Sequence, residues 1–240
     1  MKYLAFDIET RVDKALLRRT YRPSAKGSDE DVYQEVRQQL IAEHGSDFVP
    51  VSFHVPVCIV LGSIGDNLVL TSVETLGDET AEPAALAREF WTRIEAADGV
   101  LLSFNGRGFD LPVLELQALR YGIEAPRYFN ERNGQRYRYS DRHYDLYEFL
   151  SNFGAHRIRG GLDLLSQLVG LPGKGEVTGS DVQKLWESGR REDIRRYCRR
   201  DVIQTYLLFL RVERMRGRIN DAQLAELWRA GAPWMAELCD

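Results

Sequence analysis

The sequence contains few cysteines, and the three that occur are Cys58, Cys198 and Cys239. They are scattered and odd in number, and they form neither a CxxC pair nor a Cys/His spacing typical of zinc sites. We therefore expect neither a disulfide framework nor a structural zinc site. This use of cysteine is typical of a reducing, cytoplasmic compartment.

Long hydrophobic runs are also lacking. No apolar stretch approaches the roughly 20 residues that a membrane-spanning helix needs. Asp7 and Glu9 interrupt the first apolar run almost at once, so the N-terminus does not have the pattern of a signal peptide. We therefore expect no membrane association and a cytoplasmic location.

An excess of positive charge is missing as well. The 240 residues include 32 Lys and Arg against 36 Asp and Glu, which gives a formal net charge of −4. Binding of nucleic acid therefore cannot be inferred from the bulk charge, and any basic surface must be local. With 44% hydrophobic and 28% charged residues, the composition is typical of a globular protein with a sizeable core.

The hydrophobic pattern predicts an α/β fold in one domain over residues 1–240, because neither a repeat nor a clear linker is present. Strands are predicted at 2–8, 57–64, 67–74 and 99–104, of which the second and third form a hairpin around a Gly-Asp-Asn turn. Helices are predicted at 81–97, from Asp110 onward, at about 191–213 and at about 220–238.

Two segments are predicted to be additions to this pattern. Residues 11–55 are polar and indicate a helical insertion after the first strand, where Ser28 can cap a helix with Asp31 at its third position. Residues 215–240 indicate a helical extension at the C-terminus.

Two carboxylates lie one residue apart in the first predicted strand, in the stretch FDIET at 6–10. Alternate side chains of a strand share a face, so Asp7 and Glu9 point the same way. Adjacent anions repel each other, and burying them is costly unless something positive lies beside them. Their face is therefore either plainly solvated or the site of a divalent cation, and these ten residues leave both open.

Two further stretches carry acidic residues in suitable places. In SFNGRGFDLPVL at 103–114, Asp110 follows a strand end and opens a helix. In YCRRD at 197–201, Tyr197 and Asp201 share one helix face because they are four residues apart. Hydrolysis of a phosphodiester by two metal ions needs such carboxylates, and a phenol can orient the attacking water. Oxygen ligands suit Mg²⁺ or Mn²⁺.

In this order, the three stretches resemble the first, second and third motifs of the DEDD superfamily of 3′–5′ exonucleases. The chain is similar to the proofreading exonuclease domain of B-family DNA polymerases and to its stand-alone relatives. The similarity continues through SDRHYDLYEFLSNFGA and GLDLLSQLVGLPGKG and is weakest in residues 11–50 and 215–240. It implies a ribonuclease H-like fold, which is a mixed five-stranded sheet flanked by helices, with a helical C-terminal half. The fifth strand is hard to place, and residues 126–141 are the best candidate.

The resemblance implies a role for each residue of the motifs. Asp7 would bridge two metal ions, while Glu9 and Asp201 would complete the site that activates water. Asp110 would serve the second ion, directly or through water, on the side of the leaving 3′ oxygen. Tyr197 would orient the nucleophilic water.

The same resemblance points to the tyrosine branch of the superfamily and to residues that contact substrate. Arg196 stands where the histidine branch has its histidine, five residues before the last aspartate. Asn105 matches an asparagine that reaches the terminal nucleotide, and Phe109 is a candidate to pack against a base or sugar. Lys174, in a Gly-rich loop, is a candidate phosphate contact.

Several of these residues have structural alternatives. Asp110 could cap the helix that it opens, because aspartate is a good N-cap. Tyr197 could be an ordinary core tyrosine, and Asn105 could simply form a turn. Asp145 and Glu148 have the spacing of a capping box, which we favour over a further metal site.

The segment between the second and third motifs gives two more expectations. His143 is expected to be a structural hydrogen-bonding residue. The stretch RYRYSDR at 136–142 alternates Arg and Tyr, so as a strand it would have one basic and one aromatic face. Such a strand could bind single-stranded nucleic acid or could place its tyrosines on the core.

The expected activity is stepwise removal of nucleoside 5′-monophosphates from a nucleic-acid 3′ end, with single-stranded DNA favoured. Two alternatives remain, an exoribonuclease and an inactive nuclease fold that binds nucleic acid. The four carboxylates do not distinguish RNA from DNA. Because 240 residues leave no room for a polymerase, we expect a part in DNA repair or end trimming. Protein partners cannot be inferred.

Overall fold

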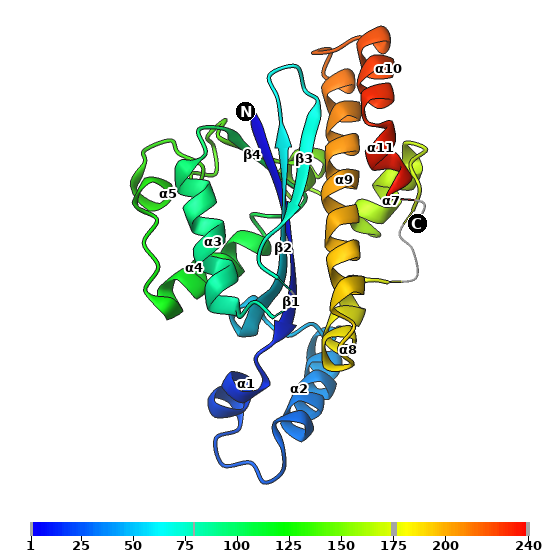
Figure 1. The fold of residues 1–240 in the computed structure, drawn as a ribbon. Helices are drawn as coiled ribbons and strands as arrows, with labels where there is room; N and C mark the ends of the chain where they lie inside the picture. The colour runs from blue at the N-terminus through cyan, green and yellow to red at the C-terminus, as the bar shows by residue number, and fades with distance from the viewer. Residues whose placement is uncertain (1, 79, 174–176, 239–240) are drawn as a thin grey trace.

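The computed structural model describes residues 2–78, 80–173 and 177–238 (Figure 1). Its centre is a five-stranded sheet with the strand order β3-β2-β1-β4-β5. The strands are β1 (Tyr3–Val12), β2 (His54–Ile64), β3 (Leu70–Thr75), β4 (Val100–Ser103) and β5 (His143–Asp145). β2 is antiparallel to both β1 and β3, whereas β4 is parallel to both β1 and β5. The sheet is therefore mixed, as the resemblance implied.

The central strand β1 is longer than predicted. Its sequence YLAFDIETRV is buried along most of its length, because both faces of the sheet are covered. The strand continues beyond Ile8 because it pairs with β2 as far as Val12, through a register shift between Glu9 and Thr10. The hydrophobic pattern did not predict this continuation, because several of the residues after Ile8 are polar.

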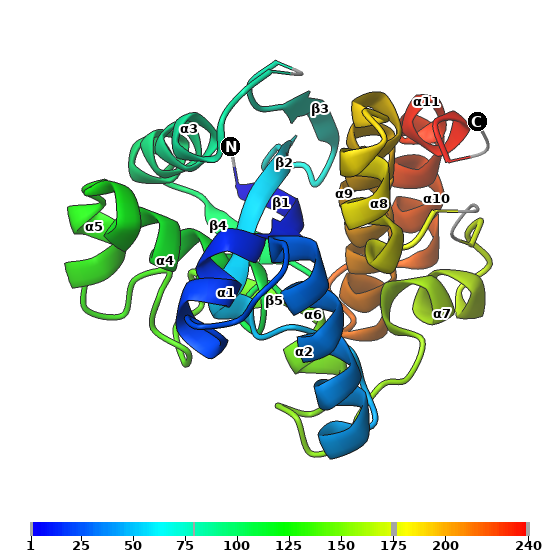
Figure 2. The same cartoon turned by 90° about the horizontal axis from the view of Figure 1, so that it is seen from below.

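Helices cover both faces of the sheet (Figures 1 and 2). On one face lie α3 (Pro83–Ala96), α4 (Asp110–Tyr121) and the short α5 (Pro126–Asn130). The long helix α9 (Arg191–Met215) crosses the other face, beside α7 (Gly161–Leu168), α10 (Asp221–Ala230) and α11 (Ala232–Ala236). Alternate residues of β1 feed two cores, with Phe6 packed toward α3 and Ala5 toward α9.

The fifth strand does not lie within residues 126–141, so that prediction is wrong. Residues 126–130 form helix α5, and the stretch 136–142 forms turns. The strand is His143–Asp145, parallel to β4. Three residues are too few to show an alternating pattern, so only pairing with β4 defines this strand. The tyrosines of RYRYSDR do not lie on the core either, because Tyr137 and Tyr139 are exposed.

The segment expected as an insertion folds into α1 (Lys14–Tyr21), α2 (Asp29–His44) and the 3₁₀ turn η1 (Val51–Phe53). The predicted cap at Ser28 is confirmed, because its side chain accepts from Asp31 N–H while the Asp31 carboxylate accepts from Ser28 N–H. These helices bury a small hydrophobic cluster of their own.

Two polar contacts attach this segment to α8 (Val182–Glu187). Val12 N–H donates to Gln183 Oε1 at 2.8 Å. The Lys14 ammonium lies between the carboxylates of Glu30 and Glu187. In Figure 1, α1 and α2 accordingly lie below the sheet, next to α8.

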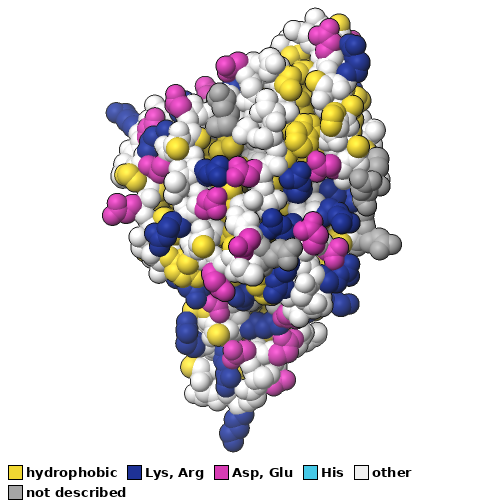
Figure 3. All heavy atoms as spheres, viewed as in Figure 1, with side chains coloured by type: hydrophobic (Ala, Val, Ile, Leu, Met, Phe, Trp, Pro, Cys, Tyr) yellow, Lys and Arg dark blue, Asp and Glu magenta, His cyan; other side chains and the backbone are white. Residues whose placement is uncertain are grey.

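The C-terminal half is helical, as expected. The predicted helix at 220–238 is interrupted at Gly231, which separates α10 from α11. Basic and acidic side chains are interspersed on the face shown in Figure 3, and hydrophobic side chains gather near α9 and α10. Within the described residues, none of the helices combines the length and hydrophobicity that crossing a membrane requires.

Candidate active site

Three of the four predicted acids come together where β1 meets α9. Asp7 and Glu9 lie on β1, and Asp201 lies on α9. One carboxylate oxygen from each residue falls within 4.8 Å of the others. Glu9 and Asp201 are buried, and Asp7 is partly buried. This arrangement could hold a metal ion through hard oxygen ligands.

The strand geometry explains why Asp7 and Glu9 face α9. They alternate with Phe6 and Ile8, which belong to the core on the opposite face. Helix α9 comes close to the sheet because β2 has a glycine beneath it, Gly62. A Cβ atom there would lie 3.0 Å from a side-chain methyl carbon of Val202. The shared face predicted from the sequence is therefore observed.

Tyr197 lies on α9 one turn before Asp201 and is buried beside the cluster. Burial raises the pKa of its phenol, and the carboxylates of Asp201, Glu9 and Asp7 raise it further. The hydroxyl group therefore stays protonated at neutral pH. Across from it is Gly179, where a Cβ atom would be 4.0 Å from the phenolic oxygen.

Asp110 lies outside the group of three and is tied to the strand backbone. It is the first residue of α4, and its Oδ1 accepts from Ile8 N–H at 3.1 Å, between Asp7 and Glu9. The N-cap of α4 is Phe109 rather than Asp110, so the simple capping alternative is wrong. Burial raises the Asp110 pKa to about 7, with a smaller contribution from nearby acidic groups.

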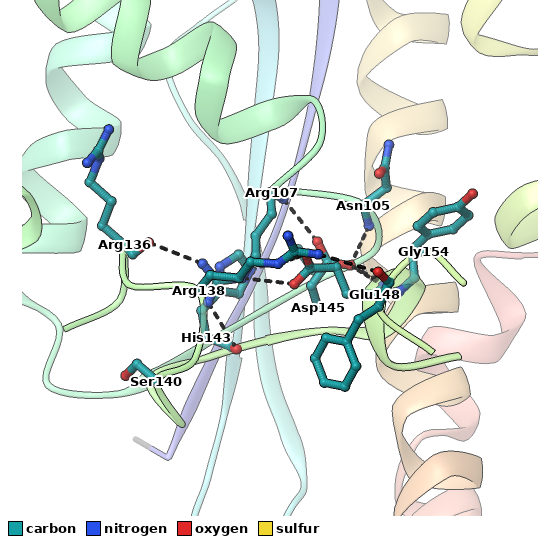
Figure 4. A network of polar contacts seen from close by, with 12 residues as sticks. Asn105, Arg107, Arg136, Arg138, Ser140, His143, Asp145, Glu148 and Gly154 are labelled. Carbon is teal, nitrogen blue, oxygen red and sulfur yellow. Dashed lines mark hydrogen bonds and ion pairs between the residues drawn. The ribbon is translucent and has the colours of Figure 1, made fainter. Parts of the chain in front are cut away.

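The turn that precedes α4 is held by Asp145. Asn105 has a left-handed backbone with φ of 64°, so it forms the turn as its structural alternative predicted. Its N–H donates to Asp145 Oδ1 at 2.9 Å, and Arg107 N–H donates to Asp145 Oδ2 at 3.0 Å (Figure 4). Gly108 lies close to the Asn105 side chain, because a Cβ atom there would be 2.4 Å from Asn105 Oδ1.

Asp145 also caps the next helix, α6 (Leu146–Leu150). Its side chain accepts from Tyr147 N–H and Glu148 N–H, so the predicted cap is confirmed for Asp145. Glu148 departs from the predicted box, because its carboxylate pairs with Arg107 at 3.4 Å and Arg138 at 3.1 Å.

His143 has the structural role that was expected. The buried ring shares a hydrogen bond of 2.8 Å between Nε2 and Ser103 Oγ. Burial lowers its pKa well below the usual value, so the ring is neutral at pH 7. His143 therefore joins β5 to β4 and lies apart from the acid cluster.

A cleft of about 520 Å³ opens from Glu9 toward the segment 11–55. Asn105 and Phe109 line it, as do Phe48 and His54. The Phe48 ring is 54% exposed and stacks on the His54 ring at a centroid distance of 5.3 Å, and it is 6.0 Å from Phe109. The cleft therefore has an aromatic wall beside the acids.

No pattern in the sequence indicated Phe48 or His54, because both lie in the polar segment 11–55, which carries none of the motifs. His54 is fixed by Thr10 Oγ1 at 2.7 Å from Nδ1 and by Val49 O at 3.0 Å from Nε2. Burial lowers its pKa, so the ring stays neutral. Only the tertiary structure brings this wall to the acids.

Cys198 is a second neighbour of the acids that the sequence did not indicate. Its thiol donates to Asp7 Oδ2 at 3.3 Å and contacts Asp7 O at 3.4 Å. Burial raises the pKa of this thiol. Lys174, the candidate phosphate contact, lies outside the described residues.

Comparison with known proteins identifies relatives among exonucleases and DNA polymerases. Residues 46–237 match the family of predicted 3′–5′ exonucleases related to the exonuclease domain of PolB. A DNA polymerase of Archaeoglobus fulgidus is 25% identical over 168 residues, which covers 63% of this chain and 21% of the polymerase.

A similar fold occurs in the family B DNA polymerase of the hyperthermophilic archaeon Pyrobaculum calidifontis. The TM-score is 0.54 at 18% identity, and the match covers 88% of this chain and 24% of that one. This chain thus spans less than a quarter of either polymerase. The match to the family model covers most of the chain, including Asp110 and Asp201. The chain therefore belongs to the family of predicted 3′–5′ exonucleases related to the exonuclease domain of PolB.

Proposed function

We propose that this chain is a metal-dependent 3′–5′ exonuclease that removes nucleoside 5′-monophosphates from single-stranded DNA. The observation that carries this proposal is the convergence of Asp7, Glu9 and Asp201 within 4.8 Å. Membership of the exonuclease family supports the direction of hydrolysis. Repair or trimming of DNA ends, in the cytoplasm, is the kind of process that such an activity fits.

The residues present fit divalent cations such as Mg²⁺ or Mn²⁺. Three carboxylates, two of them buried, repel one another unless cations lie between them. Asp7, Glu9 and Asp201 would hold one ion, and Asp7 together with Asp110, directly or through water, would hold the second. When bound, the ions lower the pKa of the attacking water and stabilise charge on the attacking and leaving oxygens.

The protein's own groups position the reactants. The Tyr197 phenol, protonated because its pKa is raised, can hold the attacking water by a hydrogen bond. The hydrogen bond from Ile8 N–H holds the Asp110 carboxyl against β1. The thiol of Cys198 fixes the Asp7 carboxylate in the same way.

The cleft supports a single-stranded end as substrate. Its aromatic wall of Phe48 and Phe109 offers ring faces, on which a base can stack only after it leaves a duplex. Asn105, in the turn that precedes Phe109, also lines the cleft and would contact the terminal nucleotide. Lys174 would add a phosphate contact. The same geometry admits an RNA end, so sugar preference has to be measured.

The decisive experiment uses a DNA oligonucleotide and its RNA twin, each labelled at the 3′ end, with Mg²⁺, Mn²⁺ or a chelator. We expect release of nucleoside 5′-monophosphate from DNA with either ion and none with chelator. A phosphorothioate at the 3′ end should protect the substrate, whereas a block at the 5′ end should not. Faster hydrolysis of RNA would identify an exoribonuclease, and protection by the 5′ block alone would refute the proposal.

A further inference from the structure

A second hollow lies next to the active-site cleft and has a volume of about 400 Å³. It is lined by the turn at 105–108, by Arg136 and Arg138, and by side chains between 147 and 154. Asn105 and Gly108 line both the hollow and the cleft, so the two adjoin at this turn. We call the hollow the arginine groove.

Arg107 builds the arginine groove from beneath. Its side chain is only 11% exposed and donates to the carbonyls of Arg136 at 3.3 Å and His143 at 3.4 Å (Figure 4). The segment is also fixed by buried Gln135, whose side-chain amide donates to Gly99 O at 3.0 Å. The turns at 134–142 are thereby held in one position against the sheet.

Arg136 and Arg138 offer their charges to solvent. Their side chains are 53% and 52% exposed, and each pairs with one carboxylate, Glu115 and Glu148 respectively. Arg136 makes two hydrogen bonds to Glu115, and Arg138 pairs with Glu148. Because both guanidinium groups are more than half exposed, a phosphate can compete with these carboxylates for them. Residues 126–160 contain seven arginines and four acidic residues, in a chain whose net charge is −4.

Phe153 presents an aromatic ring at the edge of the groove. It is 57% exposed, and its backbone is left-handed with φ of 57°, between Asn152 at 52° and Gly154 at 86°. This conformation is uncommon for a bulky residue, so the surrounding structure has to hold it. It is held by Phe153 N–H donating to Glu148 O at 2.7 Å and by Gly154 N–H donating to Ser151 Oγ at 3.1 Å.

We propose that the arginine groove holds the nucleotides that precede the 3′-terminal one, with Arg136 and Arg138 on their phosphates and Phe153 stacked on a base. The inference rests on the proposed function and extends it from the terminal nucleotide to the upstream strand. A single strand is the occupant, because stacking on Phe153 needs an unpaired base. A strand with its 3′ end in the cleft would cross the shared turn at Asn105 and Gly108 to enter the groove.

The test compares substrates that reach the groove with one that stops short of it. The short substrate is the p-nitrophenyl ester of thymidine 5′-monophosphate, which has one nucleotide and a chromogenic leaving group. The long ones are oligodeoxythymidylates from dinucleotide to dodecanucleotide. For the wild type, we expect KM to fall as the first few nucleotides are added and then to become constant.

Substitutions in the groove should act on the long substrates alone. Phe153→Ala should raise their KM by roughly 5- to 150-fold, whereas Phe153→Trp should restore binding. The double variant Arg136→Ala/Arg138→Ala should reduce the slope of log affinity against log salt by about 1.4, at about 0.7 per lost phosphate contact. The KM for the p-nitrophenyl ester should stay unchanged in each variant.

Arg88→Ala is the matched control, because Arg88 is an exposed arginine on α3. It should leave both the KM and the salt slope unchanged. Melting temperatures of all variants show whether the turns at 134–142 remain folded. A folded Phe153→Ala or double variant with wild-type KM and salt slope on the dodecanucleotide would overturn the inference.

Failure of the proposed function has a different signature. In that case the wild type would not release mononucleotide from either class of substrate. Binding of a fluorescent dodecanucleotide in chelator then still tests the groove, because it needs no turnover. Tighter binding of a blunt duplex than of the single strand would also overturn the inference.

Discussion

The cleft beside the acid cluster adjoins the arginine groove at the turn 105–108, yet the cluster and the groove are built in opposite ways. The cluster is mostly buried, and its side chains project from a central strand and a 25-residue helix. The groove is exposed, and its side chains project from turns fixed by Arg107, Gln135 and Asp145. Regular elements thus hold the groups that need accurate positions, and irregular ones present the groups that meet a variable ligand.

The two regions also use charge differently. In the cluster, burial and neighbouring carboxylates raise the pKa values of Tyr197 and Asp110. In the groove, guanidinium groups that are more than half exposed pair with carboxylates at the surface. Substitutions in the cluster should therefore act on turnover, and those in the groove should act on binding.

Asp201→Asn should have the largest effect and should distinguish the role of the acid cluster in turnover from that of the groove in binding. Loss of this ligand should reduce turnover on the order of 10³-fold or more, because electrostatic stabilisation of the transition state is usually the largest contribution. Binding of a dodecanucleotide in chelator should remain, because the groove is intact. Single-turnover rates and fluorescence anisotropy on one preparation measure both quantities. Glu192→Gln, on an exposed position of the same helix, is the control.

Tyr197→Phe should have the next largest effect. Removing the hydroxyl should lower the single-turnover rate about 10–10³-fold, since it positions the water while the carboxylates keep their places. KM should change little, because the lost contact is to water rather than to the nucleic acid. A folded variant with an unchanged rate would remove Tyr197 from the mechanism and leave the ordinary core tyrosine as its role.

Phe48→Ala tests whether the cleft wall contacts the terminal nucleotide while the groove contacts the upstream nucleotides. Phe48 lines the cleft proposed to hold the terminal nucleotide, so KM should rise roughly 5- to 150-fold for both the p-nitrophenyl ester and the dodecanucleotide. Phe153→Ala should affect only the latter. Phe48→Tyr should retain the wild-type KM because it keeps the ring. An effect of Phe48→Ala on the dodecanucleotide alone would place Phe48 on the upstream strand.

Asp110→Asn should give the smallest effect, which is on stability without metal. The carboxyl has a pKa of about 7 in the folded chain and about 3.9 when unfolded. The folded state therefore holds the proton more tightly, so this group's contribution to stability is full below about pH 4 and lost as the pH rises to about 7. In chelator, the variant should melt a few degrees higher than the wild type at pH 8 and match it at low pH. Equal melting temperatures at pH 8 would contradict the raised pKa.

By itself, the sequence determined those features that depend on local pattern. Alternation placed Asp7 and Glu9 on one face of a strand, and helical spacing placed Tyr197 and Asp201 on one face of a helix. Four of the five strands and the Ser28 cap follow from the same local rules. The substrate contacts of Asn105, Phe109 and Lys174 remain predictions.

The tertiary structure decided what depends on residues far apart in the chain. It placed β5 at His143–Asp145 through pairing with β4, and it tied Asp110 to Ile8 across 102 residues. It also brought Phe48 to the acids and turned RYRYSDR into an exposed arginine groove. Periodicity indicates which residues share a face, but only packing determines which distant faces meet, because turns and short strands have no period to reveal them.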